Sequence, residues 1–264
     1  MQAPFSLYEL KRYANTKLSD GQAEGGQALE ATGGWQGRRA IVTGGGRGIG
    51  RAIAEGLVAG GAEVHVFDAA GGTGPEGTAM HAVDVTCAGA VGDAVAALGR
   101  VDLLVNNAGI TRDRSILRMT DEEWRQVLDV NLTGAFNLIR AVAPGMTGAG
   151  YGRIVNLVSI NGLRGKFGQA NYAASKGGLV ALTKTAAREF GRKGVTVNAV
   201  APGMVLTEMT LALAPEVRQR ALDETLLGRL PGVEDVAAAV LFLLSDRAAF
   251  VTGQVLQVDA GQYV

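Results

Sequence analysis

The stretch RAIVTGGGRGIG, residues 39–50, decides the fold. It begins as a β-branched, apolar run and passes through a cluster of glycines. It then leads into residues 49–59, whose apolar spacing predicts an amphipathic helix. Glycines at a strand-to-helix turn let the backbone approach a diphosphate closely, and the free N–H groups of the helix attract its negative charge. The stretch therefore predicts a dinucleotide-binding βα unit.

Outward from this unit, short apolar runs alternate with helix-length segments. The runs predict seven strands, at residues 39–43, 63–68, 80–85, 101–106, 153–159, 196–201 and 255–258. Apolar strands separated by helices are typical of a parallel sheet covered on both faces. We expect an α/β fold with one Rossmann-like, doubly wound domain over residues 37–264 and a lid at about 204–231. Residues 1–36 are polar and glycine-rich, and predict a flexible extension or an arm that contacts another subunit.

Composition limits the possible partners. Among 264 residues the acidic and basic side chains are equal in number, 25 each, so no basic surface for nucleic acid is indicated. One cysteine and two histidines are too few for a zinc-type site. No apolar run reaches the about 20 residues of a membrane span, and no secretory signal is recognisable. We expect a cytoplasmic protein with a small-molecule substrate, and no metal, membrane or nucleic acid.

The glycine spacing is distinctive. Thr43 precedes Gly44, Gly48 and Gly50, which gives the pattern TGxxxGxG. This pattern differs from the usual dinucleotide-binding spacing and resembles the signature of the short-chain dehydrogenase/reductase family. The resemblance extends from about residue 38 to the end of the sequence.

Two later motifs support the same resemblance. Asn107, Ala108 and Gly109 follow the fourth predicted strand and resemble the NNAG motif of the family. Pro202 and Gly203 follow the sixth predicted strand and resemble its PG motif. The resemblance implies a nicotinamide cofactor that is bound by Gly44, Arg47, Gly48, Ile49, Gly50, Asp68, Asp84, Val85, Asn107, Ala108, Gly109, Tyr172, Lys176, Pro202, Gly203, Val205 and Thr207.

Two of these residues bear on the choice of cofactor. Asp68 ends the second predicted strand, where a carboxylate can accept both ribose hydroxyls of adenosine and repels a 2′-phosphate. Arg47, within the glycine loop, could instead pair with a 2′-phosphate. We expect NAD(H) to be favoured, because a like-charge clash is harder to avoid than a missing attraction, and NADP(H) stays open.

Four polar residues suggest the chemistry. Tyr172 and Lys176 are four residues apart, which places them on one face of a helix. A neighbouring ammonium is expected to lower the pKa of the phenol, ordinarily about 10. Ser159 ends the fifth predicted strand, at the sheet edge where ligands bind. Asn131 lies in a mostly apolar helical stretch, residues 121–143, and needs partners there.

The resemblance implies that these residues form a catalytic tetrad. In the family, the equivalent of Tyr172 exchanges a proton with the substrate oxygen, which the equivalent of Ser159 holds. The equivalent of Lys176 lowers the pKa of the tyrosine and binds the nicotinamide ribose, and that of Asn131 holds a water for proton relay. The implied activity is hydride transfer between a nicotinamide cofactor and a ketone or secondary alcohol.

Residues 107–113 (NAGITRD), 165–176 (GKFGQANYAASK) and 253–264 resemble 3-oxoacyl-[acyl-carrier-protein] and acetoacetyl-CoA reductases in particular. This resemblance implies a 3-oxoacyl thioester carried on acyl carrier protein (ACP) or CoA, and a homotetramer. Asp68 and the extension leave open an NAD-dependent catabolic dehydrogenase of a cyclic alcohol or polyol. A non-catalytic dinucleotide-sensing protein on the same fold is the alternative of another class.

Overall fold

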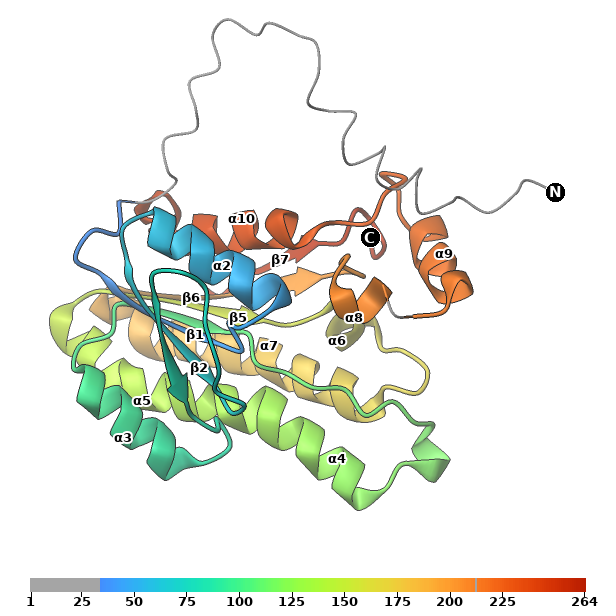
Figure 1. The fold of residues 1–264 in the computed structure, drawn as a ribbon, viewed down its shortest axis with the longest axis horizontal. Helices are drawn as coiled ribbons and strands as arrows, with labels where there is room; N and C mark the ends of the chain where they lie inside the picture. Colours follow the sequence, from blue (N-terminus) through green and yellow to red (C-terminus); the bar gives the residue numbers. More distant parts are fainter. Residues whose placement is uncertain (1–33, 212) are drawn as a thin grey trace, which may run out of the picture. The chain divides into compact units, whose positions relative to one another are not determined.

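The computed structural model describes residues 34–211 and 213–264, so the predicted extension lies almost wholly outside the described residues. The described chain contains a seven-stranded, all-parallel sheet in the order β3-β2-β1-β4-β5-β6-β7 (Figure 1). The strands are β1 (Arg39–Thr43), β2 (Glu63–Asp68), β3 (Thr78–Ala82), β4 (Leu103–Asn106), β5 (Gly152–Leu157), β6 (Val195–Pro202) and β7 (Val255–Val258).

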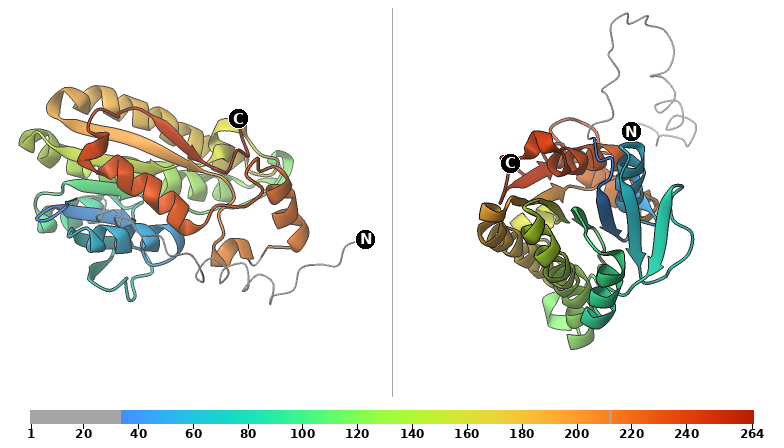
Figure 2. Two further views of the ribbon diagram at one scale, coloured as in Figure 1. Left: turned by 90° about the horizontal axis from the view of Figure 1, so that it is seen from above. Right: turned by 90° about the vertical axis from the view of Figure 1, so that its left-hand side faces the viewer.

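Helices cover both faces of this sheet (Figure 2). One layer contains α2 (Gly48–Ala59) and α10 (Val233–Leu244), and the other contains α3 (Ala88–Leu98), α5 (Gly134–Ala149) and α7 (Ala170–Phe190). The shorter elements are α4 (Asp121–Leu128), α6 (Ile160–Arg164), α8 (Glu208–Leu211), α9 (Pro215–Asp223), the 3₁₀ turns η1 (Ile116–Arg118), η3 (Gly191–Lys193) and η4 (Asp246–Ala248), and the π-helical turn η2 (Asp129–Thr133). Within the described ranges, no helix combines the length and apolarity needed to cross a membrane.

Alternation along the strands divides the core into two layers. Ala40 and Val42 of β1 pack in the cluster under α2 and α10, which also includes Trp35. Ile41, between them, packs in the cluster under α3, α5 and α7. Successive side chains of a strand point to opposite faces, so a run that is apolar throughout is buried on both sides. The predicted doubly wound α/β fold is confirmed.

The third strand is shorter and earlier than predicted. It was expected at residues 80–85, and the structure places β3 at Thr78–Ala82. The cause is its pairing with β2, because β2 ends at Asp68, which is in register with Ala82. Beyond that point β3 has no partner strand, so Asp84 and Val85 lie past its end.

Two further predictions of local structure are corrected. Ser159 does not end a strand, because β5 stops at Leu157. Ser159 is instead the N-cap of α6, and its hydroxyl accepts the Asn161 N–H at 3.2 Å. The helix predicted over residues 121–143 consists of α4 and α5, joined by the π-helical turn η2.

A short polar chain crosses the apolar core. Asn156 of β5 is fully buried and accepts a hydrogen bond from Asn106 Nδ2 of β4 at 2.8 Å. Its own Nδ2 donates to Thr183 Oγ1 of α7, also at 2.8 Å. Thr196 of β6 is also buried, but its hydroxyl has no hydrogen-bond partner among the described residues. The hydrogen bonds of Asn156 therefore connect β4 and β5 to α7, whereas the Thr196 hydroxyl adds no hydrogen bond to the core.

We predict opposite effects on stability from two substitutions of similar shape. Asn156→Leu leaves the Asn106 amide buried without its acceptor and lowers the free energy of unfolding by about 2 kcal/mol. Thr196→Val removes a buried polar group that makes no bond and raises the free energy of unfolding by about 1 kcal/mol. Urea unfolding followed by circular dichroism measures both, and a Thr196→Val variant less stable than the parent contradicts the second prediction.

Candidate active site

The glycine loop after β1 is shaped for close approach to the backbone. Gly44 and Gly48 have φ of +63° and +54°, in the left-handed region that favours glycine. A Cβ on Gly50 would overlap the carbonyl of Gly44 and the amide of Asn107. Arg47 is the N-cap of α2, and no side chain in the described structure caps this helix. The first N–H groups of α2 therefore remain available to an anion.

A bracket of hydrogen bonds fixes this loop to the end of β4. Thr43 Oγ1 accepts the backbone N–H groups of Asn107 and Ala108, both at 2.9 Å. Asn107 Nδ2 donates to the carbonyls of Thr43 at 2.9 Å and Gly44 at 3.0 Å. These residues lie where the strand order reverses, the place at which open α/β sheets bind ligands. Thr43 belongs to the TGxxxGxG pattern, but the sequence does not predict it as a contact of the cofactor.

Two predicted residues adjoin the glycine loop from other elements. Asp68 ends β2, and its Oδ2 would lie 3.7 Å from a Cβ on Gly46. Thr207 Cγ2 would lie 3.9 Å from a Cβ on Gly48. The loop therefore has a carboxylate on one side and the start of segment 204–231 on another. Arg47 is exposed.

Asp84 and Val85 are placed differently. Asp84 is exposed, and its Oδ1 accepts both the N–H and the hydroxyl of Thr86, at 2.9 and 2.8 Å. The Val85 side chain is buried in the core under α3 and α5, and its carbonyl accepts Asn137 Nδ2 at 3.0 Å. Neither side chain contacts the glycine loop through a hydrogen bond.

Three predicted catalytic side chains meet beyond the end of β5. The hydroxyl of Ser159 lies close enough to the Tyr172 phenol to act on its pKa. Lys176 is 4% exposed, and its Nζ donates to the Leu157 carbonyl at 2.7 Å. The same Nζ lies 5.7 Å from the centre of the Tyr172 ring. The four-residue spacing on α7 therefore places the phenol and the amine side by side, with the serine opposite the phenol.

The direction of the phenol pKa differs from the expectation. Burial raises the pKa of Tyr172 above 10, and the Ser159 hydroxyl only partly opposes this. The carboxylate of Asp113 adds to the rise. Burial lowers the pKa of Lys176 to about 8. The expected lowering of the tyrosine pKa is not met, because removal from water outweighs the opposing effect of the Ser159 hydroxyl.

Asn131 connects two sides of the site. It lies in η2, is 1% exposed, and bonds Ile110 through its Oδ1 at 2.8 Å and its Nδ2 at 3.0 Å. Its Nδ2 also donates to Ser175 Oγ at 3.1 Å, and that hydroxyl donates to the Tyr172 carbonyl at 2.8 Å. A Cβ on Gly109 would lie 3.5 Å from Lys176 Nζ. The four predicted catalytic residues and Gly109 thus lie together.

Two side chains of this region escaped the sequence analysis. Asn171 is fully buried, and its Nδ2 donates to the carbonyls of Arg112 and Glu123, both at 3.0 Å. Gln262 bonds the Met204 N–H through its Oε1 at 2.7 Å. The position of Asn171 next to Tyr172 is the one sequence feature that points to a role for it at the site. No sequence feature points to Gln262, because its partner Met204 is 58 residues away.

The remaining predicted contacts belong to β6 and the segment after it. Pro202 is the last residue of β6, and Gly203 follows it against Gln262, whose amide a Cβ on Gly203 would overlap. Val205 is 5% exposed and packs in the core under α2 and α10. Ile49 packs against the same core from α2. The side chains of Val205 and Ile49 contribute packing to this core rather than polar contacts.

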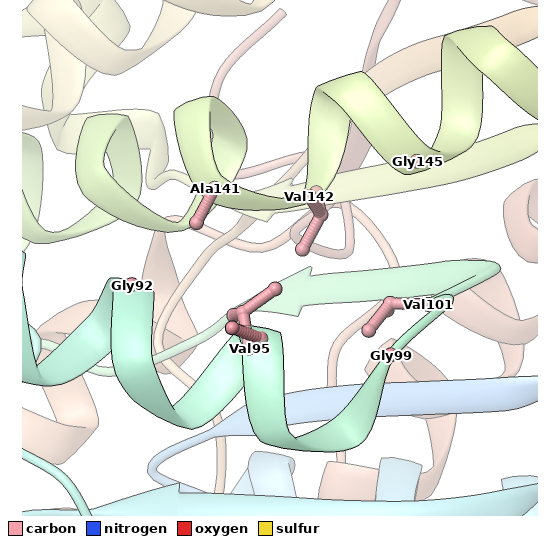
Figure 3. Close-up of a pocket in the computed structure, with 8 residues that line it drawn as sticks. Gly92, Val95, Gly99, Val101, Ala141, Val142 and Gly145 are labelled. Atoms are coloured by element: carbon pink, nitrogen blue, oxygen red, sulfur yellow. The ribbon is translucent and has the colours of Figure 1, made fainter.

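An apolar pocket lies apart from these residues, between α3 and α5 (Figure 3). It is lined by Val95, Val101 and Val142, with Gly92, Gly99 and Gly145. The lining offers no titratable or hydrogen-bonding side chain, and none of it belongs to the predicted site. The described residues also contain no cluster of three side chains suited to hold a metal ion.

Comparison with known proteins bears on this geometry. A family model described as "Enoyl-(Acyl carrier protein) reductase" matches residues 44–262. A 3-oxoacyl-[acyl-carrier-protein] reductase of Salmonella typhimurium is 43% identical over 242 residues, which cover 87% of this chain and 99% of the relative. An acetoacetyl-CoA reductase of Rhizobium meliloti is 44% identical over 237 residues, which cover 86% of this chain and 98% of the relative.

A solved structure agrees with these relatives. A putative gluconate dehydrogenase of Agrobacterium tumefaciens superposes with a TM-score of 0.81 and 34% identity, over 88% of this chain and 98% of that one. Sequence and fold thus agree over the same part of the chain. The chain belongs to the short-chain dehydrogenase/reductase family and is an NAD(P)-dependent oxidoreductase.

Proposed function

We propose that this enzyme transfers hydride between NAD(H) and the 3-oxo or 3-hydroxy group of an acyl thioester carried on ACP or CoA. The observation that carries the proposal is the placement of the Tyr172 phenol, which the Ser159 hydroxyl acts on, beside the buried amine of Lys176, whose Nζ lies 5.7 Å from the centre of the Tyr172 ring. The names of the relatives, which are 43% and 44% identical, support the thioester as substrate.

The residues present fit a dinucleotide. Gly44, Gly48 and Gly50 leave the backbone bare at the start of α2, where N–H groups can bind a diphosphate. Asp68 would accept the hydroxyls of the adenosine ribose and repel a 2′-phosphate. When bound, the nicotinamide supplies or accepts the hydride. Both bonds from Thr86 go to Asp84 Oδ1, so its Oδ2 could still accept the amino group of the adenine.

The side chains at the reacting centre have separable tasks. Because the pKa of Tyr172 is raised, its phenol is protonated at neutral pH and can donate a proton to the substrate oxygen during reduction. Ser159 donates its hydroxyl hydrogen to the same oxygen and stabilises charge there. The Lys176 ammonium donates one N–H to the Leu157 carbonyl, which leaves two N–H groups to donate to the nicotinamide ribose and to the phenol oxygen. A relay water held by Asn131 stays a prediction.

A second candidate substrate has support of its own. The solved structure of a putative gluconate dehydrogenase is 34% identical, and Asp68 favours NAD, the cofactor typical of an oxidative role. We therefore propose a polyhydroxy acid or polyol as the alternative substrate. Turnover of acetoacetyl-CoA and gluconate, followed by absorbance of the reduced cofactor, separates the two candidates.

Assembly, the lid and location are proposals as well. We propose a homotetramer, supported by exposed apolar side chains of the kind found at subunit interfaces, such as Phe136 on α5, Phe242 near the end of α10 and Phe250 after η4. We propose that segment 204–231, which contains α8 and α9, covers the substrate as a lid. A cytoplasmic location stays a prediction.

We predict that Tyr172→Phe lowers kcat for acetoacetyl-CoA reduction by at least about a hundredfold, because the proton donor is lost. The affinity for NADH, measured by fluorescence titration, changes little. Tyr151→Phe is the matched control, since Tyr151 precedes β5 at the opposite end of that strand and bonds Asp246. Equal kcat in the Tyr172→Phe and Tyr151→Phe variants contradicts the assignment.

We predict that Asp68→Ser shifts cofactor preference towards NADPH. Removal of the carboxylate relieves repulsion of a 2′-phosphate and removes an acceptor for the ribose hydroxyls, so the ratio of kcat/KM for NADPH to that for NADH rises at least about tenfold. Arg47→Ala, made in the Asp68→Ser background, reduces the gain if the guanidinium assists. An unchanged ratio in Asp68→Ser contradicts the role of Asp68.

We predict a loss of activity with rising pH that belongs to Lys176. Its pKa is lowered to about 8, so the ammonium is present below this pH and lost above it, while Tyr172 keeps its proton. The profile of kcat/KM, which reports the free enzyme, should therefore fall above pH about 8. Lys176→Arg keeps its charge, so any residual activity should lack this fall. A wild-type profile flat to pH about 10 contradicts the prediction.

A further inference from the structure

Segment 204–231, proposed above as a lid, is closed at its base. The Leu206 N–H donates to the Pro231 carbonyl at 2.9 Å, which joins the two ends of the segment. Between these ends the chain carries α8 and α9. Residues 259–263, which follow β7, contact the segment at several points, and we call them the anchor turn.

The anchor turn has a fixed backbone. Asp259 accepts the N–H groups of Gly261 and Tyr263 through its two carboxylate oxygens, both at 3.0 Å. Ala260 has a φ of +56°, in the left-handed region that alanine rarely adopts. Its carbonyl accepts the N–H groups of Leu226 at 2.9 Å and Leu227 at 3.2 Å. The residue with the strained backbone therefore bonds the lid directly.

Gln262 makes two contacts with the lid through one side chain. It is 8% exposed. Its Oε1 accepts the N–H of Met204, the first lid residue, at 2.7 Å. Its Nε2 donates to the carbonyl of Ala221 in α9 at 2.8 Å. One buried side-chain amide therefore bonds both the first residue of the lid and the helix α9 within it.

Arg164 links this contact to the reacting centre. It ends α6, the helix whose N-cap is Ser159. Its Nη1 donates to the Gln262 carbonyl at 3.2 Å, and its Nη2 lies 2.9 Å from a carboxylate oxygen of Glu224, just after α9. The element that positions the serine hydroxyl thus bonds both the anchor turn and the lid.

We propose that Gln262 is a positioning residue, which holds the lid over the Ser159–Tyr172 pair and so sets the affinity for substrate. This proposal rests on the proposed function, which defines the substrate whose affinity is set. The bond to Ala221 is buried and the bond to Met204 is partly buried, so their loss leaves polar groups of the lid unpaired in the closed position. The lid then spends more time open, and the substrate meets a less complete site.

The experiment uses the full chain and three variants. Gln262→Met keeps the approximate length of the side chain but loses both bonds. Gln262→Glu keeps the acceptor for Met204 and loses the donor to Ala221. Gln219→Met is the matched control, because Gln219 lies on α9, the helix that Gln262 contacts, and its amide bonds Asp223, one turn away, at 2.7 Å and no other side chain among the described residues.

The first readout needs neither cofactor nor substrate. Trypsin cleaves after Arg218 and Arg220 when α9 unfolds locally. The rate of cleavage there, followed by mass spectrometry, therefore reports how firmly the lid is held in place. We expect this rate to rise about tenfold in Gln262→Met and Gln262→Glu and to stay unchanged in Gln219→Met. Cleavage rates at arginines outside the lid, such as Arg51 and Arg188, should not change.

The second readout is kinetic. For whichever substrate the wild-type enzyme turns over, KM should rise about tenfold in the two Gln262 variants, while kcat changes less than about twofold. A residue needed only for folding would instead lower the amount of active enzyme, and thus kcat, with KM unchanged.

Three results overturn the proposal. They are an unchanged rate of cleavage within α9, faster cleavage throughout the chain, and faster cleavage within α9 with unchanged KM. If the wild-type enzyme turns over no thioester or polyol, the proposed function fails, and the cleavage rates alone decide whether Gln262 holds the lid.

Discussion

The hydroxyl of Thr43 accepts two backbone N–H groups from the segment after β4, and the rest of the site depends on this bracket. At this point β1 and β4 end side by side, and the elements that follow diverge, α2 to one face of the sheet and α5 to the other. Divergence opens a crevice, and the return bonds from Asn107 to Thr43 and Gly44 keep its walls at a fixed separation. Because Gly50 has no Cβ, the Gly44 carbonyl and the Asn107 amide can pack against the start of α2.

The second half of the site is a buried cation with neutral surroundings. Burial alone accounts for the lowered pKa of Lys176, whose Nζ bonds a backbone carbonyl rather than a carboxylate. Asn131 adds another neutral hydrogen bond, to Ser175 of α7, one residue before the lysine. Such an arrangement gains little stability, because removing an ammonium from water is costly. It does leave the charge free to act on an oxygen that becomes negative, which is the usual reason for such costs at a functional site.

Sequence was informative where one element decides the outcome. Strands β1, β2 and β7 have the predicted bounds, because their apolar runs end at a glycine, a charged residue or a polar turn. The third strand was misplaced, since its end is set by register with β2 rather than by its own residues. The pKa of Tyr172 was predicted in the wrong direction, because spacing on a helix shows a neighbour but not the depth of burial. Gln262 needed a partner far along the chain.

The bonds from Leu226 and Leu227 to Ala260 also imply an order of assembly. During synthesis the glycine loop, β4 and α7 emerge before the residues that hold segment 204–231 in place. Local contacts form before distant ones, so the crevice for the dinucleotide can form on the ribosome while the opposite wall is still loose. The glycine loop that would hold the diphosphate is thus made well before the residues that fix the segment expected to cover the substrate.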